Sequence, residues 1–119
     1  RVVVMNSDGP TLPLNYLHQA FEQLDHFDVT LGTGHDGGYY LIGMKQLQRE
    51  IFRNISWSST RVVAETLTIC KRLQLNVLQL PQWYDVDVAD DLGRLRRDLA
   101  NNPSVAPRTK AFLEQWHVD

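Results

Sequence analysis

The chain has 119 residues, 43% of them hydrophobic and 22% charged, and these proportions predict one globular domain over residues 1–119. The net charge is −2, and Lys and Arg cluster only at residues 94–97, so no nucleic-acid-binding groove is expected. The sequence shows no secretory signal and no apolar run long enough to span a membrane, and its single cysteine excludes an intrachain disulfide. We therefore expect a cytoplasmic protein with no membrane partner.

Strand-like and helix-like segments alternate along the chain, and alternation of this kind predicts an α/β layer fold. The predicted strands are residues 1–5, 28–32, 39–44 and 76–80. The predicted helices are residues 14–24, 60–73, 89–100 and 107–116.

Two of the predicted helices have an apolar face. In the first helix, this face consists of Leu14, Leu17, Phe21 and Leu24. In the second helix, it consists of Val63, Leu67 and Cys70. Cys70 is therefore predicted to be a core residue rather than a nucleophile.

An acidic turn, "NSDGPTLPL", follows the first strand directly. One interpretation is structural: Asp8-Gly9-Pro10 is favourable turn chemistry, and Thr11 or Pro13 could open the next helix. The other is functional, because ligands of α/β folds gather beyond the carboxyl ends of strands. The carboxylate of Asp8 would then be a hard oxygen ligand suited to Mg²⁺ or Mn²⁺.

A second acidic turn, "GHDGGYYLIG", lies between two predicted strands. Asp36-Gly37 is a strong signal for a β-hairpin, because glycine tolerates the positive φ of a tight turn. Alternatively, Gly37 and Gly38 allow backbone N–H groups to approach a substrate closely. His35 faces away from Asp36 in an extended segment, so an acid–base pair of the two is not favoured.

The third acidic turn, "WYDVDVADDL", follows the last strand. If it is extended, Asp85 and Asp87 project from the same face, and a divalent cation would relieve their repulsion. Alternatively, Asp87 caps the next helix, whose dipole favours Asp90 and Asp91 in its first turn. The two roles of Asp87 can coexist.

Two tryptophans adjoin predicted loops. Trp57 and Trp83 could pack as large apolar groups, or they could stack on a base or a sugar.

Four segments in this order resemble a family of bacterial GT-A-fold transferases over residues 1–95. The segments are "NSDGPTLPL", "LGTGHDGGYYLIGM", "IFRNISWSS" and "LPQWYDVDVADDLGRL". The family is similar to the nucleotidyltransferases that make molybdenum-cofactor dinucleotides and to phospholactate guanylyltransferase. The string "DGGYYLIG" is the most specific of the shared elements.

The resemblance implies transfer of a glycosyl or nucleotidyl group from a nucleotide-activated donor, with Mg²⁺ or Mn²⁺ as cofactor. It implies that Asp8 and Asp87 are the catalytic metal ligands. If these two share an ion, we expect their carboxylates to meet across the ends of two neighbouring strands. Asp85 is a further candidate ligand because of its spacing from Asp87. The substrate-binding positions that it implies are Asp36, Gly37, Gly38 and Tyr39.

The chain also departs from the family. Family members carry an N-terminal strand and a glycine- and lysine/arginine-rich loop that holds the nucleotide, and nothing like it precedes Arg1. We therefore expect a partial, three-layer GT-A-like fold without its nucleotide-binding half, weak donor binding, and a homo-oligomer formed through the uncovered sheet edge. The alternative is a non-catalytic, truncated remnant that acts as a binding or assembly module.

Three single positions also differ from the family pattern. Asn6 stands where the family more often has Gly, and Gly9 stands where it often has Ser. Val88 replaces the usual Thr, which removes a capping hydroxyl before the acidic helix.

Overall fold

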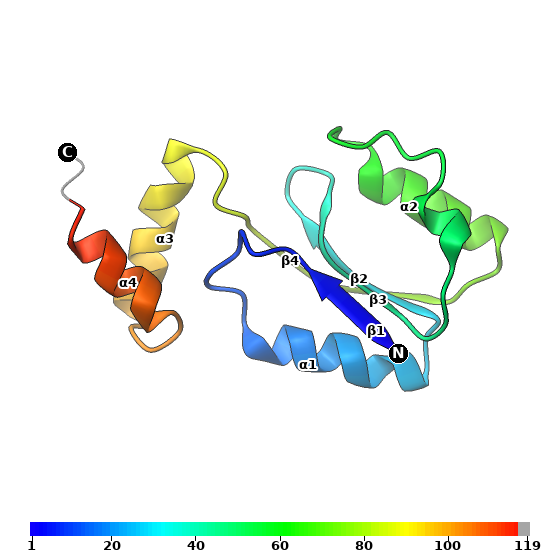
Figure 1. Cartoon of the computed structure of the whole chain (residues 1–119), viewed down its shortest axis with the longest axis horizontal. Helices are drawn as coiled ribbons and strands as arrows, with labels where there is room; N and C mark the ends of the chain where they lie inside the picture. Colours follow the sequence, from blue (N-terminus) through cyan, green and yellow to red (C-terminus); the bar gives the residue numbers. More distant parts are fainter. Residues whose placement is uncertain (117–119) are drawn as a thin grey trace.

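The structure is a computed structural model that describes residues 1–116, and it contains one four-stranded mixed sheet with helices packed around it (Figure 1). The strands are β1 (Val2–Met5), β2 (Val29–Gly34), β3 (Tyr39–Met44) and β4 (Val77–Trp83). The helices are α1 (Leu14–Glu22), α2 (Val62–Arg72), α3 (Ala89–Asn101) and α4 (Pro107–Glu114), with short 3₁₀ turns η1 (Gln23–Asp25) and η2 (Arg49–Phe52). The predicted α/β class is confirmed.

The strand order is β1-β3-β2-β4, and only β3 runs against the other three. The carboxyl ends of β1, β2 and β4 therefore lie at the same end of the sheet. Strands β2 and β4 both extend beyond their predicted ends, because Gly34 pairs with Trp83 after a register shift. The sequence pattern breaks at this irregularity although the pairing continues through it.

Helix α1 covers one face of the sheet and α2 covers the other (Figure 1). Each helix packs on the sheet through its own apolar core. On the α1 side, Ala20 packs with Tyr40, Leu41 and Leu80. On the α2 side, the buried residues are Val29, Leu31, Ile42, Met44, Ile51 and Cys70. Cys70 is 1% exposed, so its predicted place in the core is confirmed.

The buried face of α1 agrees with the predicted one only in part, since Leu17 packs against the core and Leu24 is buried as expected. Leu14 and Phe21 are 66% and 47% exposed, whereas Ala20 and Leu24 are fully buried. Helix α1 ends at Glu22, so Leu24 lies in the 3₁₀ turn that follows. The small side chain of Ala20 lets α1 approach the sheet closely enough for the Thr30 hydroxyl to donate to the Ala20 carbonyl at 2.9 Å.

Helices α3 and α4 lie beside the sheet rather than on it (Figure 1). Tyr84 connects α3 to the segment before α1: its hydroxyl donates to Asp98 Oδ2 at 2.6 Å and accepts from the Thr11 hydroxyl at 2.9 Å. The Arg94 guanidinium lies 3.9 Å from the centre of the Tyr84 ring. None of the helices within residues 1–116 has the length and apolar character needed to cross a membrane.

Candidate metal and substrate site

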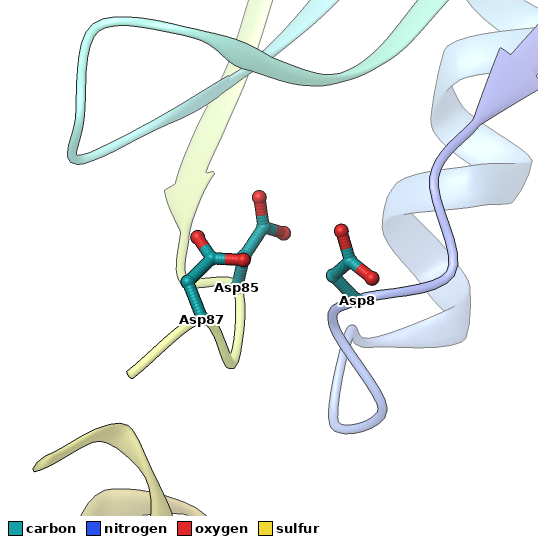
Figure 2. A group of neighbouring side chains, drawn as sticks. All are labelled: Asp8, Asp85 and Asp87. Carbon is teal, nitrogen blue, oxygen red and sulfur yellow. The ribbon is translucent and has the colours of Figure 1, made fainter. Parts of the chain in front are cut away.

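Three aspartates from two distant segments meet at the end of the sheet where β1 and β4 terminate. Asp8 follows β1, and Asp85 and Asp87 follow β4. One carboxylate oxygen from each lies within 4.8 Å of the other two. Figure 2 shows the three carboxylates facing a common space. We refer to Asp8, Asp85 and Asp87 as the acidic triad.

The triad is not formed by neighbouring strands, so that expectation is wrong. Strands β3 and β2 lie between β1 and β4 in the sheet. The segments after β1 and β4 bend toward each other instead, and the Val86 N–H donates to the Asp8 carbonyl at 2.8 Å. This backbone contact holds the two acidic segments together independently of the carboxylates.

Asn6 is a site residue that sequence reasoning did not assign. Its side-chain amide donates to Asp85 Oδ2 at 3.2 Å, and its carbonyl oxygen accepts from the Asp8 backbone N–H at 3.3 Å. One amide thus positions parts of both acidic segments. The available signal was a polar residue placed directly after a β-branched strand.

The triad is electrostatically strained. Burial, followed by the charges of Asp87, Asp36 and Asp8, raises the pKa of Asp85, while the Asn6 hydrogen bond opposes the rise. Desolvation, followed by the charges of Asp8, Asp36 and Asp91, raises the pKa of Asp87. Asp85 Oδ1 is also buried, and no group within residues 1–116 forms a hydrogen bond with it.

A divalent cation fits this arrangement. It would relieve the repulsion, and an ion bound through Asp85 Oδ1 would also give that oxygen a partner. Ligands on opposite sides of Mg²⁺ lie about 4 Å apart, so oxygens within 4.8 Å of one another are near enough to share an ion after small side-chain movements. The ligand roles of Asp8, Asp85 and Asp87 remain predictions.

Asp87 does not cap α3, so the capping alternative is wrong. The N-cap residue is Val88, which has no side-chain acceptor. The Asp91 carboxylate instead accepts from the backbone N–H groups of Asp87 at 2.9 Å and Val88 at 3.1 Å, and these bonds lower the pKa of Asp91. The Asp87 carboxylate therefore lies with the triad while Asp91 satisfies the helix start.

The second acidic turn forms the predicted hairpin between β2 and β3. Gly37 has a φ of 87°, the Gly34 N–H donates to the Gly38 carbonyl at 2.8 Å, and Asp36 Oδ1 accepts from the Gly38 N–H at 3.0 Å. Asp36 is close enough to raise the pKa of both Asp85 and Asp87.

The remaining predicted substrate residues lie around this hairpin. The close approach that Gly37 permits is to Thr60, before α2, because a Cβ on Gly37 would lie 2.0 Å from the Thr60 carbonyl oxygen. Tyr39 is half-buried, burial raises its pKa, and it lines a cavity together with Asp36 and Gly38. Substrate binding by these residues remains a prediction.

Comparison with known proteins supports a transferase-like fold. Residues 1–59 match the family model described as "Uncharacterized protein conserved in bacteria (DUF2064)". The chain is similar, at 38% sequence identity and a TM-score of 0.88, to a crystal structure of a "putative nucleotide-diphospho-sugar transferase" from Desulfovibrio desulfuricans G20. The similarity covers 96% of this chain but only 50% of that one, so the chain spans half the length of the Desulfovibrio protein. No significant match occurs among curated proteins.

Proposed function

We propose that the chain carries the metal-binding part of a transferase site that uses a nucleotide-activated sugar as donor. The observation that carries the proposal is the acidic triad: two distant segments bring three carboxylates within 4.8 Å, and one buried oxygen of Asp85 has no hydrogen-bond partner in the described part of the chain. The similarity to the Desulfovibrio protein supports the donor class. Asp8, Asp85 and Asp87 would hold Mg²⁺ or Mn²⁺.

The three aspartates differ in burial, and this difference suggests a different role in ion binding for each. Asp85 is partly buried and is oriented by Asn6, so it would fix the position of the ion. Asp8 and Asp87 are exposed, so the phosphates of a donor can reach the same space. When bound, the cation would neutralise the charge that develops on the diphosphate leaving group. From such a donor the glycosyl group would move to the acceptor, and the nucleoside diphosphate would be the leaving group.

Mn²⁺ titration of single variants tests the site. We expect weak binding by the wild type, because three carboxylates leave several coordination positions to water or phosphate. Asp8→Asn, Asp85→Asn and Asp87→Asn should each weaken Mn²⁺ binding by about tenfold or more, measured by calorimetry or by the electron paramagnetic resonance of free Mn²⁺.

Asp90→Asn is the matched control, because Asp90 is an exposed aspartate of the same segment outside the triad. Its Mn²⁺ binding should equal that of the wild type. If all four variants bind Mn²⁺ alike, the ion is held only by general negative charge, and the chain would fit a binding or assembly module better than a transferase site.

A further inference from the structure

A separate cavity of about 470 Å³ opens beside the β2–β3 hairpin, and Asp36 forms part of its wall. Its lining also includes Gly38, Tyr39, Trp57, Ser58 and Thr60. The volume lies in the range of small-molecule sites, roughly 300–1,000 Å³. Asp36 raises the pKa of Asp85 and Asp87, so this cavity adjoins the acidic triad without including any of its three members.

Trp57 forms an aromatic wall of this cavity. It is 53% exposed, and its ring meets Tyr39 edge to face, with centroids 6.4 Å apart and an interplanar angle of 79°. A single exposed tryptophan is ordinary on a protein surface. Trp57 differs because it lines a cavity next to a carboxylate and because the loop that carries it is fixed.

Hydrogen bonds to α2 fix the loop around Trp57. The backbone N–H and the hydroxyl of Ser56 both donate to the Glu65 carboxylate at 2.7 Å, and the Ser59 hydroxyl donates to the Ser56 carbonyl at 2.5 Å. These bonds from Ser56 lower the pKa of Glu65. A loop that is already ordered loses little conformational entropy when a ligand stacks on its aromatic residue.

The backbone next to Trp57 is in an unfavourable conformation. Ser58 has a φ of 61°, in the left-handed region that non-glycine residues rarely adopt. Such a conformation persists only where the surroundings enforce it, and it is found preferentially at functional sites. The loop therefore holds Trp57 at the cavity at a cost in backbone energy.

The chemistry of the lining selects one class of ligand. The flat indole favours a ring with an apolar face, whereas the Asp36 carboxylate accepts hydrogen bonds and repels anions such as phosphate. Ser58 and Thr60 add polar residues to the lining. A sugar ring combines an apolar C–H face with hydroxyl donors at its edge.

We propose that this cavity is a subsite for an uncharged, hydroxylated ring, namely a monosaccharide unit, that stacks on Trp57 and donates a hydroxyl hydrogen bond to Asp36. The proposal deepens the function proposed above and rests on it for the statement that the bound ring is a substrate. Binding of the ring itself needs neither metal nor nucleotide.

Saturation-transfer NMR with the methyl glycosides of glucose, galactose, mannose and N-acetylglucosamine tests the subsite in metal-free, nucleotide-free buffer. At least one glycoside should bind with millimolar affinity. Trp57→Ala should weaken that binding by about fivefold or more, and Trp57→Phe by less because it keeps an aromatic face. Trp116→Ala is the matched control, because Trp116 is 57% exposed and packs on Phe112 of α4.

Binding of none of the four glycosides by the wild type, or equal losses in Trp57→Ala and Trp116→Ala, would overturn the subsite. Two further measurements separate this failure from failure of the metal site. Trp57→Ala should keep wild-type Mn²⁺ binding, and Asp8→Asn should keep glycoside binding while it loses Mn²⁺. If Asp8→Asn retains Mn²⁺ but glycosides still require Trp57, only the metal proposal fails.

Discussion

Among single residues, Asp85 is held more tightly than the other two members of the acidic triad. It is partly buried, the Asn6 amide donates to one of its oxygens, and the other oxygen has no hydrogen-bond partner among residues 1–116. The spacing of Asp85 and Asp87 predicts that both carboxylates share a face, and the triad geometry agrees. A buried carboxylate that is repelled by its neighbours destabilises the fold unless a cation binds it. Removing the charge of Asp85 should therefore raise the stability of the metal-free protein and weaken metal binding.

Asp85→Asn should stabilise the metal-free protein at neutral pH. The native pKa of Asp85 is raised, so the native state holds its proton more strongly than the unfolded state does. Ionisation therefore lowers stability as the pH rises from below about 4 through the raised pKa, and the asparagine removes this loss. We expect a Tm a few degrees above that of the wild type at pH 7, with a gap that shrinks toward low pH.

With Mn²⁺ present, the wild type should melt at a higher temperature than Asp85→Asn, the reverse of the order without metal. Saturating Mn²⁺ should raise the Tm of the wild type and leave that of Asp85→Asn nearly unchanged, since only a ligand that prefers the folded state stabilises it. Thermal melts across pH, with and without Mn²⁺, measure both effects. A lower Tm for Asp85→Asn in metal-free buffer would mean that Asp85 is a structural residue.

Among the elements, the β2–β3 hairpin joins the acidic triad to α2. Its turn carries Asp36 on one side, and the Gly37 carbonyl accepts from the Val63 N–H in the first turn of α2 at 2.9 Å. The hairpin signal in the sequence rests on Asp36-Gly37 and is confirmed. Its contact with α2 depends on Thr60, twenty-three positions along the chain, and no local pattern contains it.

Gly37→Ala should destabilise the protein because it combines two costs. The φ of 87° disfavours any side chain, and a Cβ would collide with the Thr60 carbonyl. We expect a loss of about 2 kcal/mol or more, which corresponds to a fall in Tm of roughly 10 °C. Gly38→Ala is the neighbouring control, since its Cβ would meet only Asp36 side-chain atoms at 3.4 Å and 4.0 Å. Equal melting temperatures for the two variants would contradict the proposed packing of the turn on α2.

In the whole molecule, the chain is extended, and β1 is an edge strand of the sheet. The radius of gyration is 16.0 Å, whereas a compact chain of this length has about 13.5 Å. Helices α3 and α4 account for part of the extension because they lie beside the sheet (Figure 1). Within the described residues, β1 pairs with β3 alone, and Val2 and Val4 are 60% and 59% exposed.

We expect the isolated chain to self-associate through the open edge of β1. Exposed strand edges with apolar side chains tend to find partners. Val4→Lys should shift the population toward monomer, because a charged side chain at a strand edge opposes pairing. Val105→Lys, which changes an exposed valine before α4, should not. Light scattering at tens of micromolar measures both, and a wild type that stays monomeric would contradict the expectation.

The sequence by itself determined the element types and the chemistry of the turns. β-branched runs, the helical spacing around Cys70 and the Asp36-Gly37 turn are local signals, and local backbone and burial preferences produce the structures that they predict. The acidic residues of the candidate site were also visible as turns after strands.

Only the tertiary structure decided which of these groups meet. The order β1-β3-β2-β4 separates the strands that carry the triad, and the contact of Val86 with Asp8 brings their ends together across the intervening hairpin. The same holds for the amide of Asn6 on Asp85 and for Trp57 beside Asp36. Contacts between distant segments depend on how twisted layers pack and on which backbone groups remain to be paired, and neither is encoded in a local window of residues.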